Sequence, residues 1–236
     1  MMVWGAKPAW AGNFAQPAII GYSKDLRYFA YEEYGIEDAS GFPYSSIYFI
    51  DLRDGSPVAG TPVRIRLDNQ DDPLPGELVG ARQLARQKAQ IWLDKLKIGW
   101  PAEMLAYNGD GVPDLEGLSL RFGLTGYNGA VIGDYRLTLK MVDFNNILEC
   151  EKWAPSKPQG FVLTITDYDF QKSEIYRDKS LPKSEKCPLY YKISGVFAPF
   201  QANDISNTVA LISVYSSGWE GQDRRFIVVP VGQSLK

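Results

Sequence analysis

The residues of this chain best suited to chemistry are carboxylates that stand beside aromatic rings in the segment 31–44. Glu32, Glu33 and Asp38 lie there, and Tyr44 ends the segment. A carboxylic acid and a carboxylate together do general acid–base work in glycoside hydrolysis, and aromatic faces pack on sugar rings. The segment has two interpretations: a hairpin loop made soluble by acids, or the site of a carboxylate-dependent glycoside hydrolase or carbohydrate-binding protein.

The two adjacent glutamates do not by themselves make a catalytic pair. Side chains alternate between the two faces of a β-strand, so Glu32 and Glu33 are expected on opposite sides of the sheet. Hydrolysis would need two carboxyl groups that converge in one cleft. We therefore expect no catalytic residues and keep the hydrolase as the alternative.

A second group of polar and aromatic residues lies near the C-terminal end. Trp219, Glu220 and Arg224 stand between two strand-like runs, and Arg225 follows them. If this hairpin meets the one that carries the segment 31–44, Arg224 or Arg225 would neutralise the acidic loop, either as structural pairing or as part of a ligand site. The candidate ligand-binding residues are Glu32, Glu33, Asp38, Tyr44, Trp219, Glu220 and Arg224.

A turn near the middle of the chain resembles the calcium loops of thrombospondin type 3 and dockerin-like repeats. Asn108, Asp110 and Asp114 place oxygens at alternate positions, as calcium coordination requires. The first and twelfth ligand positions fall on Ala106 and Gly117, which have no side-chain oxygen. A calcium site and an ordinary Asn-Gly/Asp-Gly turn are the two interpretations, and we expect no other cofactor.

The composition excludes several classes of enzyme. The 236 residues contain no histidine and two cysteines, which removes Ser-His-Asp and Cys-His arrangements and zinc sites of four cysteines or of histidines. The phosphate-binding, dinucleotide-binding and hydrolase-elbow motifs are missing. A formal charge of −3 argues against a general binder of nucleic acid.

The two cysteines and the N-terminal residues favour export. Cys150 and Cys187 lie near Pro- and Lys-rich loops, where a disulfide would contribute about 3–4 kcal/mol; two unrelated buried thiols are the alternative. Residues 1–18 are expected to be an N-terminal arm or the remnant of a signal peptide, because Ala9 to Ala11 has the small-x-small form of a cleavage site. No stretch is long and apolar enough to span a bilayer.

The pattern of the chain is mainly β. Alternation over 63–67 and 135–142 is typical of half-buried strands, and Asn128-Gly129 indicates a two-residue hairpin. We expect an antiparallel β-sandwich or a propeller-like β fold of about ten strands. Residues 19–236 are expected to form one domain.

One long amphipathic helix is expected at about residues 77–98. Its apolar positions recur at helical spacing, Gly99 stands where a C′ residue belongs, and Pro101 prevents continuation. The predicted buried face consists of Leu78, Ala81, Leu84, Ala85, Ile91, Trp92 and Leu96.

Several runs resemble a bacterial family of predicted secreted proteins of unknown function. They are the residues 21–35, 41–44, 47–52, 61–64, 181–184, 187–189 and 218–227, so that the resemblance spans about residues 19 to 231. It implies export and supplies no catalytic residues. The segments 23–31 and 47–52 are also similar to one blade of TolB-like propellers, in which such units repeat about every 40 residues.

These observations lead to one main expectation about function. The chain is expected to be an exported, non-catalytic β protein, periplasmic or extracellular, with a role in binding or assembly at the cell envelope. Its partner would be an envelope protein or a glycan, and its oligomeric state stays open. The glycoside hydrolase or carbohydrate-binding protein that uses the segment 31–44 is the alternative.

Overall fold

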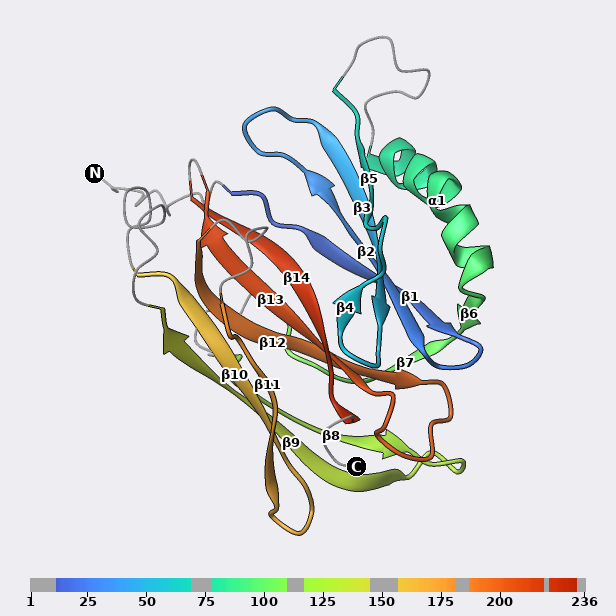
Figure 1. Ribbon diagram of the computed structural model, residues 1–236, viewed down its shortest axis with the longest axis vertical. Coiled ribbons are helices and arrows are strands. Elements are labelled where there is room, and N and C mark those ends of the chain that lie inside the picture. Colours follow the sequence, from blue (N-terminus) through green and yellow to red (C-terminus); the bar gives the residue numbers. More distant parts are fainter. Residues whose placement is uncertain are drawn as a thin grey trace, which may run out of the picture.

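The computed structural model describes residues 12–68, 78–109, 117–144, 157–180, 187–218 and 221–232. Within these ranges the fold is mainly β, with fourteen strands in three antiparallel sheets and one helix. The sheets are open and packed like a sandwich, so the first of the two expected folds is confirmed and the propeller-like one is not what forms (Figure 1).

The first sheet, which we call the N-terminal sheet, has six strands in the order β4-β3-β2-β1-β6, with β5 beside β3. Its strands are β1 Gln16–Ser23, β2 Tyr28–Ile36, β3 Pro43–Asp51, β4 Ser56–Pro57, β5 Val63–Arg66 and β6 Ile98–Trp100. The helix α1, Leu78–Lys95, lies on one face of this sheet.

The second sheet, the middle sheet, has the order β14-β13-β12-β7. Its strands are β7 Ala102–Tyr107, β12 Pro188–Pro199, β13 Val209–Ser217 and β14 Gln222–Pro230. The third sheet, the outer sheet, has the order β11-β10-β9-β8. Its strands are β8 Ser119–Thr125, β9 Val131–Asp143, β10 Gln159–Thr166 and β11 Lys172–Arg177.

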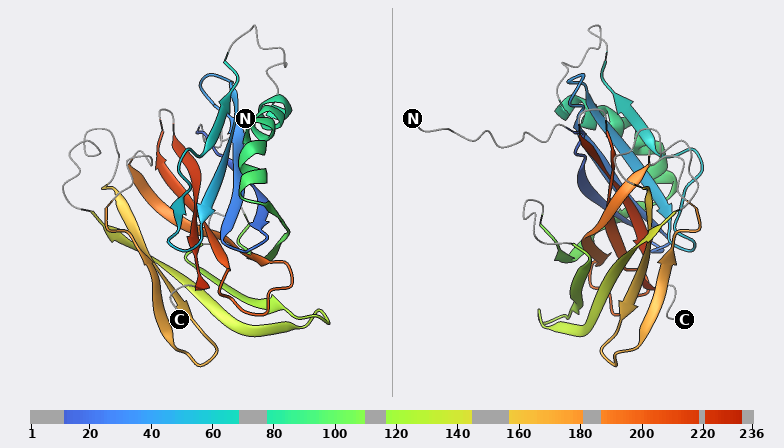
Figure 2. Two further views of the ribbon diagram at one scale, coloured as in Figure 1. Left: turned by 45° about the vertical axis from the view of Figure 1, so that its right-hand side comes forward. Right: turned by 90° about the vertical axis from the view of Figure 1, so that its left-hand side faces the viewer.

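The layers stack in the order helix, N-terminal sheet, middle sheet, outer sheet (Figures 1 and 2). A separate hydrophobic cluster fills each of the three interfaces. One joins α1 to the N-terminal sheet, one joins that sheet to the middle sheet, and the largest joins the middle and outer sheets. Because the middle sheet is covered on both faces, β13 is buried along nearly its whole length, and its sequence is mostly apolar, interrupted by Ser213 and ended by Ser216 and Ser217.

Three alanines place the helix close to the N-terminal sheet. Ala81, Ala85 and Ala89 are spaced four residues apart, are fully buried and pack against β3 and β5. The expected helix is thus confirmed over Leu78–Lys95. Its predicted buried face was wrong at Ile91, which is 69% exposed.

The helix ends earlier than the sequence indicated. Lys97 takes the left-handed conformation, with φ of 53°, where Gly99 was expected to do so, and Gly99 lies in β6. A hairpin joins β8 to β9 around Asn128-Gly129, and Gly129 has φ of 79°. Its loop is longer than the predicted two residues, because the last strand pair is Thr125 and Val131 and the N–H of Gly126 donates to the carbonyl of Ala130.

The estimate of about ten strands was low, because four strands were missed. Of these, β4 has two residues, β6 has three, and Pro101 separates β6 from β7. The fourth, β1, carries Pro17 and Gly21, residues that are unusual inside strands.

Some expectations fall on residues that the structure leaves undescribed. Cys150 lies outside the described residues, so the disulfide with Cys187 stays a prediction. The boundary at residue 18 also stays a prediction, and β1 begins at Gln16. No helix within the described ranges is long and apolar enough to cross a membrane.

Candidate functional site

The side chain of Glu32 faces the helix, where its carboxylate accepts several hydrogen bonds. Its carboxylate accepts hydrogen bonds from Arg82 Nε at 2.9 Å, Arg86 at 3.1 Å and the Ser45 hydroxyl at 2.9 Å, and its side chain is completely buried. Burial alone would raise the pKa of Glu32, but these hydrogen bonds and the two guanidinium charges outweigh it and hold the pKa below its usual value. Arg82 also stacks on Tyr34 at 3.8 Å. Glu32 therefore fastens α1 to the sheet.

Glu33 faces the opposite way, into the interface with the middle sheet. It accepts hydrogen bonds from the backbone N–H of Phe226 at 2.5 Å and from the Tyr48 hydroxyl at 3.2 Å. Burial raises the pKa of Glu33 to about 7, against the opposing effect of the nearby Arg225. The prediction that the two glutamates lie on opposite faces is confirmed, and Glu33 acts as a contact between sheets.

The two predicted hairpins do meet, and the arginine that approaches the acidic residues is Arg225. It donates to the Tyr44 hydroxyl at 2.5 Å and lies over the Tyr44 ring at 4.7 Å. Arg224 instead donates to the carbonyl of Ala15 at 2.8 and 3.1 Å, beside the ring of Phe14. Arg224 thus secures the chain just before β1.

The remaining predicted site residues are spread over the molecule. Asp38 is exposed in the β2–β3 loop, where its backbone N–H donates to Asn13. Asn108 donates to the carbonyl of Ile193 at 2.8 Å, which fixes the end of β7 to β12. The other predicted residues, Trp219, Glu220, Asp110 and Asp114, lie outside the described ranges. Among the residues that are described, no group of three or more acidic, Cys or His side chains is arranged to hold a metal ion.

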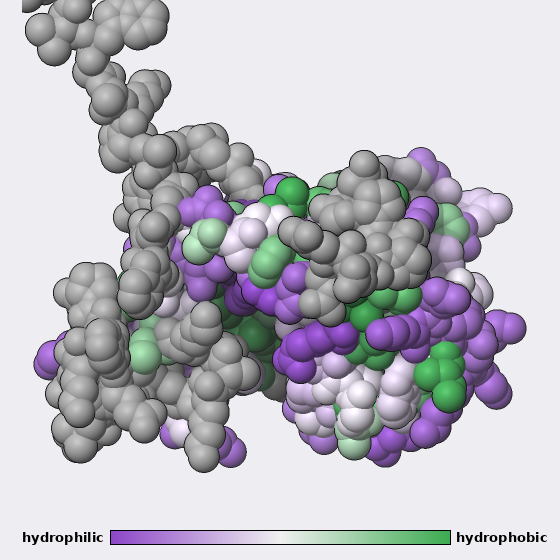
Figure 3. Space-filling view, turned by 90° about the horizontal axis from the view of Figure 1, so that it is seen from above, coloured by the Kyte–Doolittle hydropathy of each residue, from purple (hydrophilic) through white to green (hydrophobic). Residues whose placement is uncertain are grey.

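This arrangement does not give the pair of carboxyls that hydrolysis needs. Glu32 and Glu33 project to opposite faces of one sheet, and each is enclosed by its own partners. Seen from above, the described surface of the molecule carries many hydrophilic residues, with hydrophobic residues in small separate areas (Figure 3). The segment 31–44 thus has the geometry of a structural junction.

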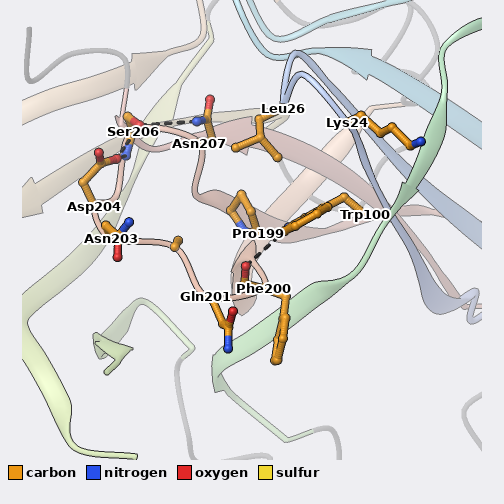
Figure 4. A pocket seen from close by; sticks show the side chains of 11 residues that line it. Lys24, Leu26, Trp100, Pro199, Phe200, Gln201, Asn203, Asp204, Ser206 and Asn207 are labelled. Carbon is orange, nitrogen blue, oxygen red and sulfur yellow. Dashed lines mark hydrogen bonds between the residues drawn. The ribbon is translucent and has the colours of Figure 1, made fainter. Parts of the chain in front are cut away.

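A pocket of about 270 Å³ lies at the other end of the N-terminal sheet, where that sheet meets the middle sheet. It is bordered by the β1–β2 turn, the end of β6 and the β12–β13 loop (Figure 4). Its lining residues are Lys24, Leu26, Trp100, Pro199, Phe200, Gln201, Ala202, Asn203, Asp204, Ser206 and Asn207. In Figure 4, Trp100 and Phe200 stand on one side, and Asp204, Ser206 and Asn207 on the other.

Hydrogen bonds to backbone carbonyls hold the pocket together across the two sheets. The N–H of Phe200 donates to the carbonyl of Pro101 at 2.9 Å, and the indole N–H of Trp100 donates to the carbonyl of Phe200 at 3.3 Å. The Tyr22 hydroxyl of β1 also donates to the carbonyl of Phe197 in β12, at 3.0 Å. These hydrogen bonds fix the walls of the pocket at the junction between the two sheets.

A glycine brings β6 to its position beside the pocket. Gly21 has φ of 136°, and a Cβ there would stand 2.5 Å from the carbonyl oxygen of Trp100. Only glycine permits β1 to approach β6 this closely, and the register of the pair shifts just after it, between Tyr22 and Ser23.

Sequence reasoning missed this pocket. Its walls come from three segments far apart in the chain, and two of the strands beside it, β1 and β6, were not predicted. One signal was present: Trp100 stands directly before a proline and outside any apolar pattern, which is unusual for a core tryptophan.

Comparison with known proteins identifies a family for this chain. A family model described as "Predicted secreted protein (DUF2259)" matches residues 30–232, which is most of the chain. None of the curated proteins matches it.

Proposed function

The chain belongs to this family of predicted secreted proteins, and on that premise we propose that it is a non-catalytic binding protein acting at the cell envelope. Its ligand site is the pocket beside Trp100. The partner is a component of the envelope that inserts a small polar group between the β1–β2 turn and the β12–β13 loop.

The observation that carries this proposal is the contrast between the pocket and the acidic hairpin. The carboxylates of Glu32 and Glu33 are enclosed by internal partners. In the pocket, by contrast, Trp100 is 43% exposed and Phe200 is 47% exposed. Large apolar side chains that border a concave site with polar groups at its rim are typical of ligand-binding sites.

The proposal is tested by the melting temperature of the full chain with and without the low-molecular-mass fraction of an envelope extract. A ligand that binds the folded state raises the melting temperature. We expect a rise for the wild type and for Glu33→Gln, and no rise for Trp100→Ala.

Tyr127→Ala is the matched control, because Tyr127 is a fully exposed aromatic residue on the β8–β9 turn, outside the pocket lining. It should behave as the wild type does. No rise for the wild type, or an equal rise for Trp100→Ala, would contradict the proposal.

A further inference from the structure

We propose that the pocket binds the ring of an uncharged saccharide, with the sugar packed on the indole of Trp100. This inference rests on the proposed function and names the chemical class of the ligand. It follows from four properties of the pocket: a presented aromatic face, polar groups opposite it, balanced charge and small size.

The indole of Trp100 is held as a platform. Its N–H is used by the carbonyl of Phe200 at 3.3 Å, and its backbone pairs with Tyr22 of β1, so both the ring and the strand that carries it are fixed. Among the described residues, the tryptophan that stacks with a ring and a cation is Trp92, which contacts Phe49 and Lys95, and not Trp100. A pyranose has one face made mainly of C–H groups, which are apolar and slightly positive, and the negative face of an indole attracts them.

The opposite side of the pocket carries groups that suit hydroxyls. Asn203 and Asn207 there, and Gln201 beside Phe200, have side-chain amides, which both donate and accept hydrogen bonds, as a sugar hydroxyl does (Figure 4). Asp204 accepts from the backbone N–H of Ser206 at 2.8 Å, which shapes the loop that presents these side chains. A ligand with hydroxyls along one edge and an apolar face would therefore find partners on both sides.

Charge and volume narrow the class of saccharide. Among the lining residues, Lys24 is the one cation and Asp204 the one anion, so the pocket favours neither an acidic nor a basic sugar. The volume of about 270 Å³ lies just below the roughly 300–1,000 Å³ of sites for drug-sized ligands. One neutral sugar ring, alone or at the end of a glycan, matches this size.

The backbone conformation around the pocket is unusual. Leu26 and Gln201 have φ of 57° and 59°, the left-handed region that residues other than glycine rarely adopt. Both residues line the pocket, Leu26 from the β1–β2 turn and Gln201 from the β12–β13 loop. Strained positions of this kind gather at binding sites, where the surrounding structure maintains them.

The test measures binding of cellobiose, maltose, lactose and diacetylchitobiose to the full chain by titration calorimetry, with glucuronic acid as the charged comparison. We expect at least one neutral disaccharide to bind the wild type and Tyr127→Ala equally. Trp100→Ala should weaken that binding by about tenfold or more, and Trp100→Phe by less, because a smaller aromatic face remains. Asn207→Ala should also weaken disaccharide binding, although the indole of Trp100 is still present.

The outcomes separate this inference from the proposed function. One outcome is that none of the neutral sugars binds, while the envelope fraction still stabilises the wild type and not Trp100→Ala. The ligand is then not a neutral saccharide, and the pocket remains the binding site of the proposed function. Equal binding of a sugar to Trp100→Ala and wild type overturns the inference, as does tighter binding of glucuronic acid. If neither sugars nor the envelope fraction bind, both proposals fall. Circular dichroism of each variant shows that a loss of binding is not a loss of folding.

Discussion

Glu32 and Glu33 are adjacent in the chain and both fully buried, yet their two surroundings give them opposite acid–base character. Between the helix and the N-terminal sheet, two arginines keep Glu32 charged. Between the N-terminal and middle sheets, burial outweighs the charges of Arg225 and Arg64 and raises the pKa of Glu33 to about 7. The difference teaches that direct hydrogen bonds from guanidinium groups can outweigh the effect of burial on a carboxyl, whereas arginine charges acting without an ion pair do not do so here.

The largest effect is expected from removing both partners of Glu32. The variant Arg82→Ala/Arg86→Ala leaves a buried carboxylate with only the Ser45 hydroxyl, and we expect the free energy of unfolding at neutral pH to fall by about 3–5 kcal/mol. Denaturant titration measures this. The control is Arg177→Ala, which removes an exposed pairing with Glu174 and should change nothing measurable. A double variant as stable as the control would mean that Glu32 does not depend on the helix.

The second effect is the pH dependence that Glu33 confers. Its pKa rises from 4.5 to about 7 on folding, so between these pH values the folded protein holds a proton that the unfolded chain releases. The stability that this proton confers is complete below about pH 4.5 and is lost as the pH rises through about 7. The loss amounts to about 3 kcal/mol over the window.

Glu33→Gln isolates this contribution, because the amide oxygen still accepts from Phe226 and does not titrate. The variant should equal the wild type near pH 4.5 and be more stable at pH 8, by up to about 3 kcal/mol. Parallel stability curves for the two proteins would show that Glu33 titrates at an ordinary pKa.

A smaller effect is expected from Tyr48→Phe. The variant removes a hydrogen bond of 3.2 Å to Glu33, at a cost of about 1 kcal/mol at pH 8, where the carboxylate is charged. Since that bond favours the charged form, its loss should move the midpoint of the Glu33 transition to higher pH. An unchanged midpoint would show that Tyr48 does not act on Glu33.

The smallest effect is expected where a carboxylate of the same hairpin meets solvent. Glu37 is paired with Arg66 at 2.9 Å in the β2–β3 loop, and both side chains are partly exposed. Glu37→Gln should leave the melting temperature unchanged, because exposed ion pairs contribute little. A clear drop in the melting temperature would mean that this exposed ion pair stabilises the fold as the buried contacts do.

The sequence predicted these junctions better than the pocket, for a physical reason. Strand alternation was enough to place Glu32 and Glu33 on opposite faces, because it depends on backbone geometry alone. Alternation places Arg224 on the face of β14 that carries Phe226 and packs against the N-terminal sheet, yet Arg225 is the arginine that reaches Tyr44, so alternation alone does not decide between the two. The pocket depends on bringing Leu26, Trp100 and Phe200 together, which no local pattern encodes.

The middle sheet has a consequence for how an exported chain reaches its folded state. Tyr31 packs in the N-terminal sheet, but its hydroxyl donates to the carbonyl of Phe226, 195 positions later. Strands β12 to β14, which cover that face, are the last to emerge when the chain is made or threaded from its N-terminus. The aromatic face of β2 and β3 therefore stays uncovered until the end, and pairing of such distant segments makes folding slow. A partner that shields this face during transit would protect the chain from aggregation.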